Sequence, residues 1–244
     1  MIPIGISEIL KAVDGTLLWG DENGVVTNVV TDSRKAGKGS LFVPIVGERV
    51  DAHQFIPQVM QAGAGVTFSS RKDVAPAASG CCIYVEDTLA ALQKAAAYYR
   101  SRFDIPVIGV TGSVGKTTTK EMISAVLEKK YRVVKTQGNW NSQIGVALMM
   151  FELEPETELA IFEMGMSLPG EMARLVEIAK PQTAVMTNIG VSHIGNLGSR
   201  ENIAKEKGHI VKYVGTSHDG KLYICGNGDM KQITRENVPY SLCE

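Results

Sequence analysis

The sequence has few cysteines and no long hydrophobic run. Its 244 residues include four cysteines, of which Cys81 and Cys82 are adjacent. Their spacing fits neither a metal site nor a disulfide framework. No apolar stretch approaches the roughly 20 residues that cross a bilayer, and the N-terminal segment lacks the basic start and apolar core of a signal peptide. These absences predict a cytoplasmic protein without membrane insertion.

A strong excess of charge of either sign is also absent. The chain carries 25 Lys and Arg against 26 Asp and Glu, a formal net charge of -1. Such a chain has no strong field to attract nucleic acid or an anionic membrane surface, so we expect no nucleic-acid partner. Repeats and low-complexity segments are missing too. The length suits one large domain or two small ones.

The first hundred residues mix short strands and helices. Ser7 is expected to begin a helix that runs through Val13, and Thr88 to cap a helix over 89–102. A third helix is predicted from His53 to Ala62. The strand candidates in this part are 25–31, 41–46, 65–68 and 82–85.

After Asp104 strands alternate with helices, which predicts a parallel sheet with right-handed crossovers. We therefore place a boundary there, giving domains at 1–103 and 104–244. The fold class is predicted as α/β, and we expect the second domain to be incomplete at its C-terminal end, with a short polar tail after Asp229. The strand candidates are 107–110, 132–135, 159–163, 183–189 and 221–225, and the helix candidates are 116–130, 143–153, 170–179 and 200–214.

The strongest motif lies between the strand candidate 107–110 and the helix that follows it. Glycines let a backbone curl so that its N–H groups point at phosphate oxygens, and a helix N-terminus adds partial positive charge. Lys116 would neutralise the outer phosphates, and the Thr117 hydroxyl would complete a magnesium shell. The predicted phosphate-binding residues are Gly112, Ser113, Val114, Gly115, Lys116, Thr117 and Thr118.

The motif departs from the general Walker pattern at one position. That pattern has a glycine five residues before Gly115, where this chain has Val110. Glycines stand on either side, at 109 and 112, so we interpret the segment as a variant phosphate loop. The alternative is an ordinary glycine turn at the end of a strand.

Polar residues after the later strands are further candidates, because an open parallel sheet binds ligands at the carboxyl ends of its strands. Glu163 could hold magnesium there or could be a solvated strand end. His193 is a softer ligand than magnesium prefers and could be structural. Lys205 and Lys207 read by spacing as a solvated helix face. Asn139 and Asn141 could be turn formers, and Asn141 or Ser142 could cap the next helix.

Taken together and in order, these motifs resemble the Mur ligases of peptidoglycan synthesis, over the whole chain. In the first hundred residues the resemblance rests on Thr31-Asp32-Ser33-Arg34, Gly39-Ser40-Leu41-Phe42-Val43 and Asp51-Ala52-His53-Gln54-Phe55-Ile56. Further along, it rests on the glycine loop, Gly138-Asn139-Trp140-Asn141, Glu163-Met164-Gly165-Met166-Ser167, Thr187-Asn188-Ile189-Gly190 through His193, Gly198-Ser199-Arg200-Glu201 and Asn227-Gly228-Asp229.

The resemblance implies a role for each candidate. A small N-terminal α/β domain would bind the UDP end of the substrate, with Ser33 and Arg34 near the nucleotide, and a P-loop domain would bind ATP, with Asn227 also near the nucleotide. Asn139 and Asn141 would line the acceptor cleft. The implied catalytic residues are Lys116, Glu163, His193 and Lys207, and the implied Mg²⁺ ligands are Thr117, Glu163, His193 and Lys207, the last after carbamylation.

The implied reaction is ATP-driven amide formation through an acyl phosphate, adding D-alanyl-D-alanine to a UDP-N-acetylmuramoyl peptide. The implied cofactors are ATP and Mg²⁺, and the expected state is a monomer. The family has a third domain that we expect this chain to lack, so we expect weak ligation or none. Alternatives are a sister ligase that adds another amino acid, a folylpolyglutamate synthase, and an inactive nucleotide- or UDP-sugar-binding module.

Overall fold

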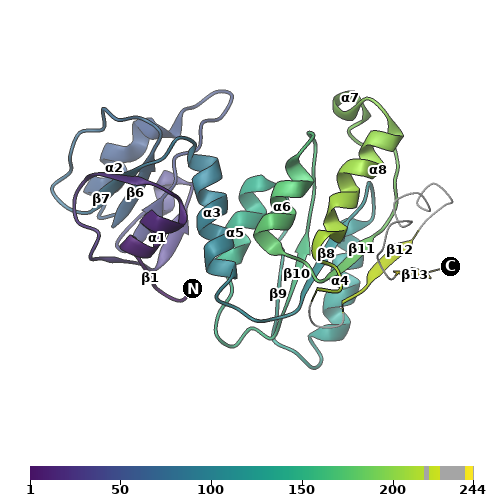
Figure 1. Cartoon of the computed structure of the whole chain (residues 1–244). Helices are drawn as coiled ribbons and strands as arrows, with labels where there is room; N and C mark the ends of the chain where they lie inside the picture. The colour runs from purple at the N-terminus through teal and green to yellow at the C-terminus, as the bar shows by residue number, and fades with distance from the viewer. Residues whose placement is uncertain (217–219, 226–239, 244) are drawn as a thin grey trace. The chain divides into compact units, whose positions relative to one another are not determined.

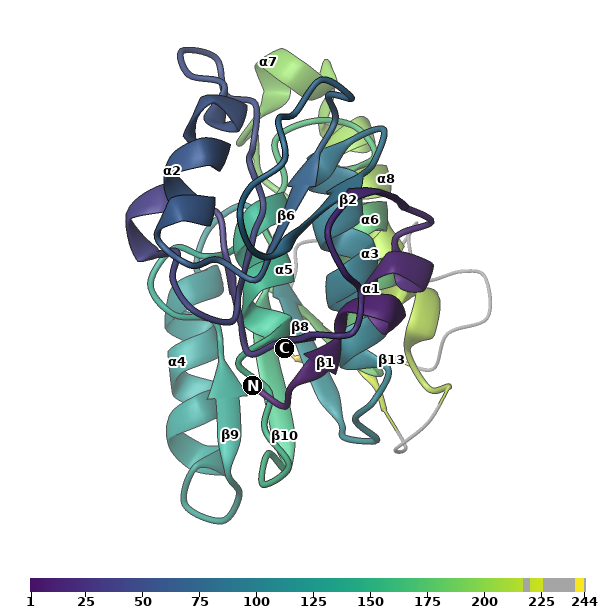
Figure 2. The same ribbon diagram turned by 90° about the vertical axis from the view of Figure 1, so that its left-hand side faces the viewer.

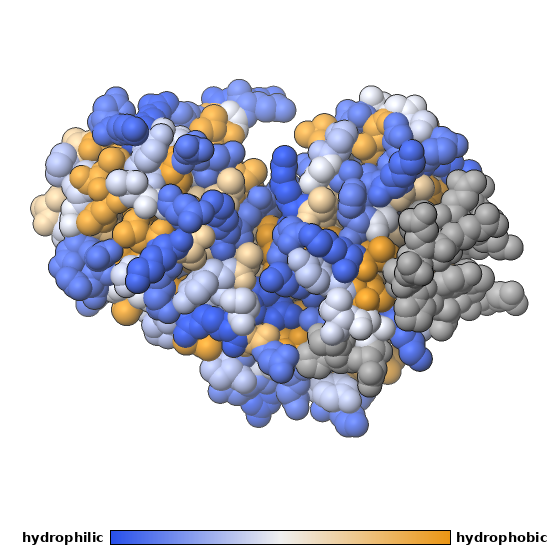
Figure 3. All heavy atoms as spheres, viewed as in Figure 1, coloured by the Kyte–Doolittle hydropathy of each residue, from blue (hydrophilic) through white to orange (hydrophobic). Residues whose placement is uncertain are grey.

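The computed structural model describes residues 1–216, 220–225 and 240–243 of the chain. It divides into two compact units, Met1–Tyr99 and Arg100–Glu244, which we call the N-terminal unit and the C-terminal unit. Both contain helices and strands, so the predicted α/β class is confirmed (Figure 1). No helix in the described ranges is long and apolar enough to cross a membrane. On the face shown in Figure 3, hydrophilic residues (blue) surround smaller groups of hydrophobic ones (orange) in both units.

The N-terminal unit is built on a five-stranded sheet in the order β2-β7-β6-β5-β4. Strands β4 to β7 are parallel, and β2 is antiparallel to β7. A separate antiparallel pair joins β1 and β3. The strands are β1 (Ile4–Gly5), β2 (Thr16–Trp19), β3 (Val25–Val26), β4 (Asn28–Val30), β5 (Ser40–Phe42), β6 (Val66–Ser69) and β7 (Cys81–Tyr84).

Helix α2 covers one face of this sheet. Its buried side chains Ile56, Val59 and Met60 pack with Val30 of β4 and Phe42 of β5 in one apolar cluster, which removes them from water. The helices of the unit are α1 (Ile6–Ala12), the 3-10 helices η1 (Ser33–Lys35) and η2 (Ala52–Phe55), α2 (Ile56–Gln61) and α3 (Thr88–Arg100).

Two expectations for this unit were wrong in detail. The strand expected over 25–31 is divided into β3 and β4. Thr27 lies between them, and its N–H donates to the carbonyl of Gly39 at 2.9 Å. Asp87, rather than Thr88, caps α3: its Oδ1 accepts the N–H groups of Leu89 and Ala90 at 2.7 and 3.0 Å. The Thr88 hydroxyl donates instead to the carbonyl of Pro44 at 2.6 Å.

The C-terminal unit holds a six-stranded sheet in the order β13-β12-β11-β8-β10-β9, in which every paired neighbour is parallel. The predicted parallel sheet is thus confirmed. The strands are β8 (Val107–Thr111), β9 (Val133–Lys135), β10 (Leu159–Glu163), β11 (Thr183–Met186), β12 (Leu222–Cys225) and β13 (Tyr240–Cys243). β13 lies where the sequence predicted only a polar tail.

The first strand of this unit, β8, lies between β10 and β11, with the chain continuing to the edge strand β9 before it returns. Such a reversal of strand order is where open parallel sheets bind ligands. Helix α4 follows β8 and packs on the sheet through Ile123 and Leu127, against Val110, Ile161 and Val185. Figures 1 and 2 show α4 beside β9 and β10.

The helices of this unit begin where the sequence predicted, within a residue, but several end earlier. α8 was expected to reach residue 214; it stops at Gly208 and continues as a 3-10 helix. α7 was not predicted. The helices are α4 (Lys116–Leu127), α5 (Gln143–Met150), α6 (Glu171–Ala179), α7 (Ile194–Leu197), α8 (Arg200–Gly208) and the 3-10 helix η3 (His209–Tyr213).

Candidate functional site

The loop between β8 and α4 depends on two glycines with positive φ. Gly112 has φ of 143° and Gly115 has φ of 82°, values that side chains other than glycine rarely adopt. A Cβ on Gly112 would also lie 1.9 Å from Oγ1 of Thr187. The sharp turn therefore needs glycine at 112 for both its backbone angle and its space, and α4 starts immediately after Gly115.

The missing Walker glycine has a structural explanation. Val110 is a fully buried residue of β8, paired in register with Glu163 of β10 on one side and Val185 of β11 on the other. Position 110 therefore belongs to the strand core, and the loop turns two residues later, at Gly112. A buried valine suits that position better than a glycine, which leaves apolar surface unfilled.

Two lysines meet at the start of this loop. The Nζ atoms of Lys116 and Lys207 both donate to the carbonyl oxygen of Gly112, at 3.0 and 3.1 Å. Lys207 is 1% exposed, so the interpretation of its helix face as solvated was wrong for this residue, whereas Lys205 is exposed. Burial, followed by repulsion from Lys116, lowers the pKa of Lys207 to about 8.

A buried carboxylate lies beside the helix start. Glu163 ends β10 and is 1% exposed. Its Oε2 accepts the Thr117 hydroxyl at 2.8 Å, and its Oε1 accepts Nδ2 of Asn141 at 2.6 Å. The alternative of a solvated strand end is therefore wrong for Glu163. Three of the candidates form one contiguous polar group: a hydroxyl, a carboxylate and a carboxamide.

The segment after β11 holds the glycine loop in shape. Oδ1 of Asn188 accepts the N–H groups of Ser113 and Val114 at 3.2 and 3.1 Å. The Thr187 hydroxyl donates to the carbonyl of Val114 at 2.6 Å, and the N–H of Gly190 donates to the Ser113 hydroxyl at 2.8 Å. The Val114 N–H, which we expected to face phosphate, bonds Asn188 in this structure.

Neither Thr187 nor Asn188 was singled out from the sequence as a site residue. A signal was present, because β11 pairs with β8 in parallel. The residues that follow two such strands emerge at the same edge of the sheet, so a polar pair directly after β11 is a neighbour of the loop after β8.

Comparison with known proteins agrees with this arrangement. The model of the Mur ligase middle domain matches residues 110–239, and that of the Mur ligase family catalytic domain matches residues 25–100. The chain belongs to the Mur ligase family. The resemblance recognised in the sequence is thereby confirmed.

Three named relatives show how far the similarity of this Mur ligase chain extends. It is 45% identical over 190 residues to the UDP-N-acetylmuramoyl-tripeptide–D-alanyl-D-alanine ligase of Bacillus subtilis, covering 78% of this chain and 42% of that protein. Its fold matches MurF from Acinetobacter baumannii with a TM-score of 0.87 and 30% identity, over 98% of this chain and 52% of the other.

A further match is the MurF ligase from Thermotoga maritima, whose structure is a complex with ADP. The TM-score is 0.79 at 31% identity, over 88% of this chain and 49% of that one. This Mur ligase chain thus spans about half the length of the relatives that it matches.

Two other candidates of the Mur ligase chain are exposed, and a third lies outside the described residues. His193 is exposed and has φ of 65° where α7 begins; the preceding Ser192 hydroxyl donates to the Ser113 carbonyl at 3.5 Å. In the part of the chain that the structure describes, no hydrogen bond or ion pair joins His193 to Glu163 or Lys207. Asn139 is exposed, and Asn227 lies outside the described residues.

The UDP-site candidates lie in the N-terminal unit. Ser33 opens η1, and the Arg34 guanidinium grips Asp32 with two hydrogen bonds of 2.9 and 2.7 Å. Their pairing lowers the pKa of the Asp32 carboxyl to about 2. Because 85% of the Arg34 side chain is exposed, the remaining N–H groups of its guanidinium are accessible to an anion.

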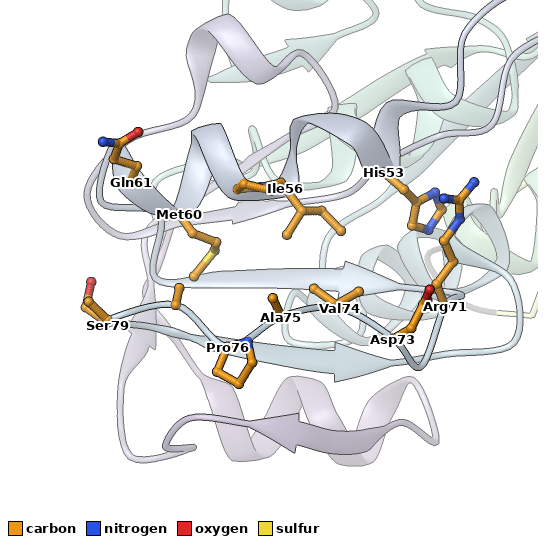
Figure 4. A pocket seen from close by; sticks show the side chains of 13 residues that line it. His53, Ile56, Met60, Gln61, Arg71, Asp73, Val74, Ala75, Pro76 and Ser79 are labelled. Carbon is orange, nitrogen blue, oxygen red and sulfur yellow. The ribbon is translucent and has the colours of Figure 1, made fainter.

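The N-terminal unit also contains a cavity of about 600 Å³ between α2 and the 71–79 loop (Figure 4). Met60, Val74 and Pro76 form its apolar part, and His53 and Arg71 lie together at one end. The His53 ring is fully engaged: Nδ1 bonds Asp51 at 2.6 Å, and Nε2 accepts the N–H of Ser70 at 3.0 Å. Ser33 and Arg34 do not line this cavity.

The donor atoms of the Mur ligase site suit magnesium in part. Mg²⁺ prefers oxygen ligands and retains several waters, and the Thr117 hydroxyl and the Glu163 carboxylate supply oxygens next to the phosphate loop. The Lys207 ammonium repels a cation as it stands. Within residues 1–216, 220–225 and 240–243, no three His, Cys, Asp or Glu side chains form a metal-binding group.

Proposed function

We propose that this chain is the UDP-substrate-binding and ATP-binding part of an ATP-dependent ligase. That ligase adds D-alanyl-D-alanine to a UDP-N-acetylmuramoyl-tripeptide in peptidoglycan synthesis, in the cytoplasm and as a monomer. The observation that carries the proposal is the 2.8 Å contact between the Thr117 hydroxyl and the buried Glu163 carboxylate at the end of a glycine loop. The names of the relatives support the substrate.

The nucleotide would bind along the loop and the first turn of α4. The N–H groups of residues 115–118 at the α4 N-terminus favour phosphate oxygens, whereas those of Ser113 and Val114 bond Asn188 in this structure. Lys116 is half-buried beside the loop. Asn227 would contact the nucleotide as well. The ADP complex of the Thermotoga maritima relative supports nucleotide binding by this fold.

Magnesium would be held through Thr117 and Glu163, and a second ion through His193 and Lys207. Such ions supply positive charge that stabilises the transferring phosphoryl group. The buried Lys207 would first be carbamylated: its uncharged amine attacks carbon dioxide, a C–N bond forms, and a proton is released. The product is a carboxylate in place of an ammonium, which turns a repelling side chain into an oxygen ligand.

The chemistry would proceed in two displacements. A peptide carboxylate oxygen attacks the γ-phosphorus, the bond from that phosphorus to the ADP oxygen breaks, and an acyl phosphate forms. The amine of D-alanyl-D-alanine then attacks the acyl carbon, releasing phosphate and a proton. Lys116 stabilises negative charge on the phosphoryl oxygens, Asn139 and Asn141 orient the acceptor, and Ser33 and Arg34 hold the UDP end.

Calorimetric titration with Mg²⁺-ATP and with UDP-N-acetylmuramoyl-tripeptide tests the proposal on the 244-residue chain. We expect both ligands to bind. Lys116→Met should weaken only the binding of Mg²⁺-ATP, and Ser33→Ala only the binding of the UDP-N-acetylmuramoyl-tripeptide. Failure of wild type to bind either ligand would refute it. In a phosphate-release assay on the longer ligase, turnover with a single amino acid in place of D-alanyl-D-alanine would indicate a sister Mur ligase.

A further inference from the structure

A second lysine of α4 is buried without a role in the proposed chemistry. Lys120 lies one helical turn after Lys116 and is 1% exposed. Its Nζ donates to the carbonyl oxygen of Thr136 at 2.7 Å and pairs with Oε1 of Glu121 at 2.8 Å. Burying an ammonium is costly unless its donors are satisfied, and an apolar side chain of similar volume often serves stability as well or better. Stability alone therefore does not explain a lysine here.

The acceptor of Lys120 has a second contact that leads to the site. Thr136 is fully buried directly after β9, and its N–H donates to the carbonyl of Ile161 at 3.0 Å. Its Oγ1 accepts the backbone N–H of Glu163 at 2.9 Å. Thr136 thus joins the Lys120 ammonium on one side to the backbone of the site carboxylate on the other.

These contacts close into a ring. Oε2 of Glu163 accepts the hydroxyl of Thr117, and Thr117 stands three residues before Lys120, on the same face of α4. The order around the ring is Lys120, Thr136, Glu163, Thr117 and back through one turn of helix. It fixes the end of β10 against the start of α4, so that the carboxylate and the hydroxyl are held together.

We propose that Lys120 is a positioning residue for Glu163, acting through Thr136; this rests on the proposed role of Glu163 in holding magnesium. Mg²⁺ demands near-ideal octahedral geometry, so two protein oxygens must already stand at the right separation. Outer hydrogen-bond partners of ligating carboxylates are what set such positions. Lys120 does this from the buried side of the site, without contacting the metal or the nucleotide.

The test is the magnesium dependence of ADP binding by the 244-residue chain, measured by calorimetry. In Lys120→Met and Thr136→Val, the Mg²⁺ concentration for half-maximal enhancement of ADP binding should rise about tenfold. ADP affinity without metal should stay unchanged, since the glycine loop and Lys116 are untouched. A purely structural role would weaken binding equally with and without metal, and that result would overturn the proposal.

Matched variants test whether the effect comes from the contacts of Lys120 and Thr136. Lys135→Met removes the other lysine that pairs with Glu121 and should not shift the magnesium dependence. Thr136→Ser keeps the oxygen and should rescue the Val variant. Lys120→Met and Thr136→Val break the same chain of contacts. The double variant should therefore need no more Mg²⁺ for half-maximal enhancement of ADP binding than the more affected of the two single variants. An additive double effect would contradict the ring.

A crystal structure of Lys120→Met without nucleotide tests directly whether Lys120 sets the position of Glu163. The Glu163 carboxylate should leave the Thr117 hydroxyl; a carboxylate that stays in place would overturn the proposal. If Lys120→Met does not fold, Thr136→Val carries both measurements. If the wild-type chain does not bind ADP, the proposed function is wrong. The position of Glu163 in the variant crystal structure would still decide the role of Lys120.

Discussion

Lys116 and Lys207, 91 residues apart in the chain, donate to a single oxygen, the carbonyl of Gly112, at 3.0 and 3.1 Å. Two ammonium groups on one acceptor repel each other, and one of them is buried. The arrangement places positive charge where the proposed nucleotide would bring negative charge. It is also the position at which converting one lysine to an anion would change the electrostatics most.

Conversion of Lys207 to a carbamate can be observed directly. With ¹³C-bicarbonate, the wild-type chain should show a carbamate carbon signal in the NMR spectrum, because a buried amine with a lowered pKa reacts with carbon dioxide. Lys207→Met should abolish the signal, and Lys205→Met, an exposed neighbour on α8, should retain it. A signal that survives in Lys207→Met would assign it elsewhere.

Asn188 should control the order of the glycine loop. In Asn188→Ala the N–H of Val114 loses its side-chain acceptor, so its amide hydrogen exchange should become faster, whereas the N–H of Ser113 keeps the backbone carbonyl of residue 188 as an acceptor. Each hydrogen bond contributes about 1 kcal/mol, so ADP affinity should fall by about fivefold to tenfold. Asn196→Ala is the control, because that side chain bonds the carbonyl of Ser167 instead. Unchanged exchange at Val114 would show that the Asn188 side chain does not hold the loop.

Gly112→Ala should disable the loop. The variant must either strain φ at a positive value or push Thr187 away from a Cβ that would lie 1.9 Å from its hydroxyl. The expected cost is about 2 kcal/mol of unfolding free energy, with loss of ADP binding. Gly195→Ala, at a helical position with open space around the Cβ, should leave both unchanged. Chemical denaturation and calorimetry measure the two effects.

The adjacent cysteines should be inert at neutral pH. Burial raises the pKa of Cys81 to about 11 and that of Cys82 to about 12, and the thiolate is the reactive form. Peptide mapping after maleimide treatment of the folded chain at pH 8 should find both thiols unmodified, whereas the denatured chain should be modified at both.

The same shifts give a pH dependence of stability. The unfolded thiols ionise near their usual pKa of 9.0, whereas the folded thiols stay protonated, so the unfolding free energy should fall as pH rises from about 9 towards 11. Cys81→Ala/Cys82→Ala should flatten this slope. A slope equal to that of wild type would show that other groups cause it.

Much of the fold followed from the sequence because local signals were strong. The apolar run 159–163, ended by a glutamate, is β10 with the predicted bounds. Helix starts were also marked locally, as by Ser142, one of the two cap candidates for α5, whose hydroxyl accepts the N–H of Gly145. Helix ends were not: α3 was expected to reach residue 102 and stops at Arg100, whose guanidinium instead bonds the carbonyls of Phe103 and Ile105.

The site divides in the same way. Lys116, Thr117 and Glu163 are indicated by a glycine loop and a strand end, features that sequence patterns reveal. Lys120 and Asn188 act on groups 16 and 74 residues away. Each contacts backbone atoms, which every residue possesses and no pattern displays. Lys207 was mistaken for a solvated residue because helical spacing says nothing about what covers a helix.

The glycine loop is held by hydrogen bonds from the segment after β11. This has a consequence for folding during synthesis. The glycine loop is complete as sequence once Thr118 has been synthesised, yet its shape depends on a segment some 75 residues further on. On the ribosome, the loop should therefore lack its final shape until β11 has emerged and paired with β8. A nascent chain should therefore gain affinity for nucleotide in one step, as residues 187–190 leave the exit tunnel.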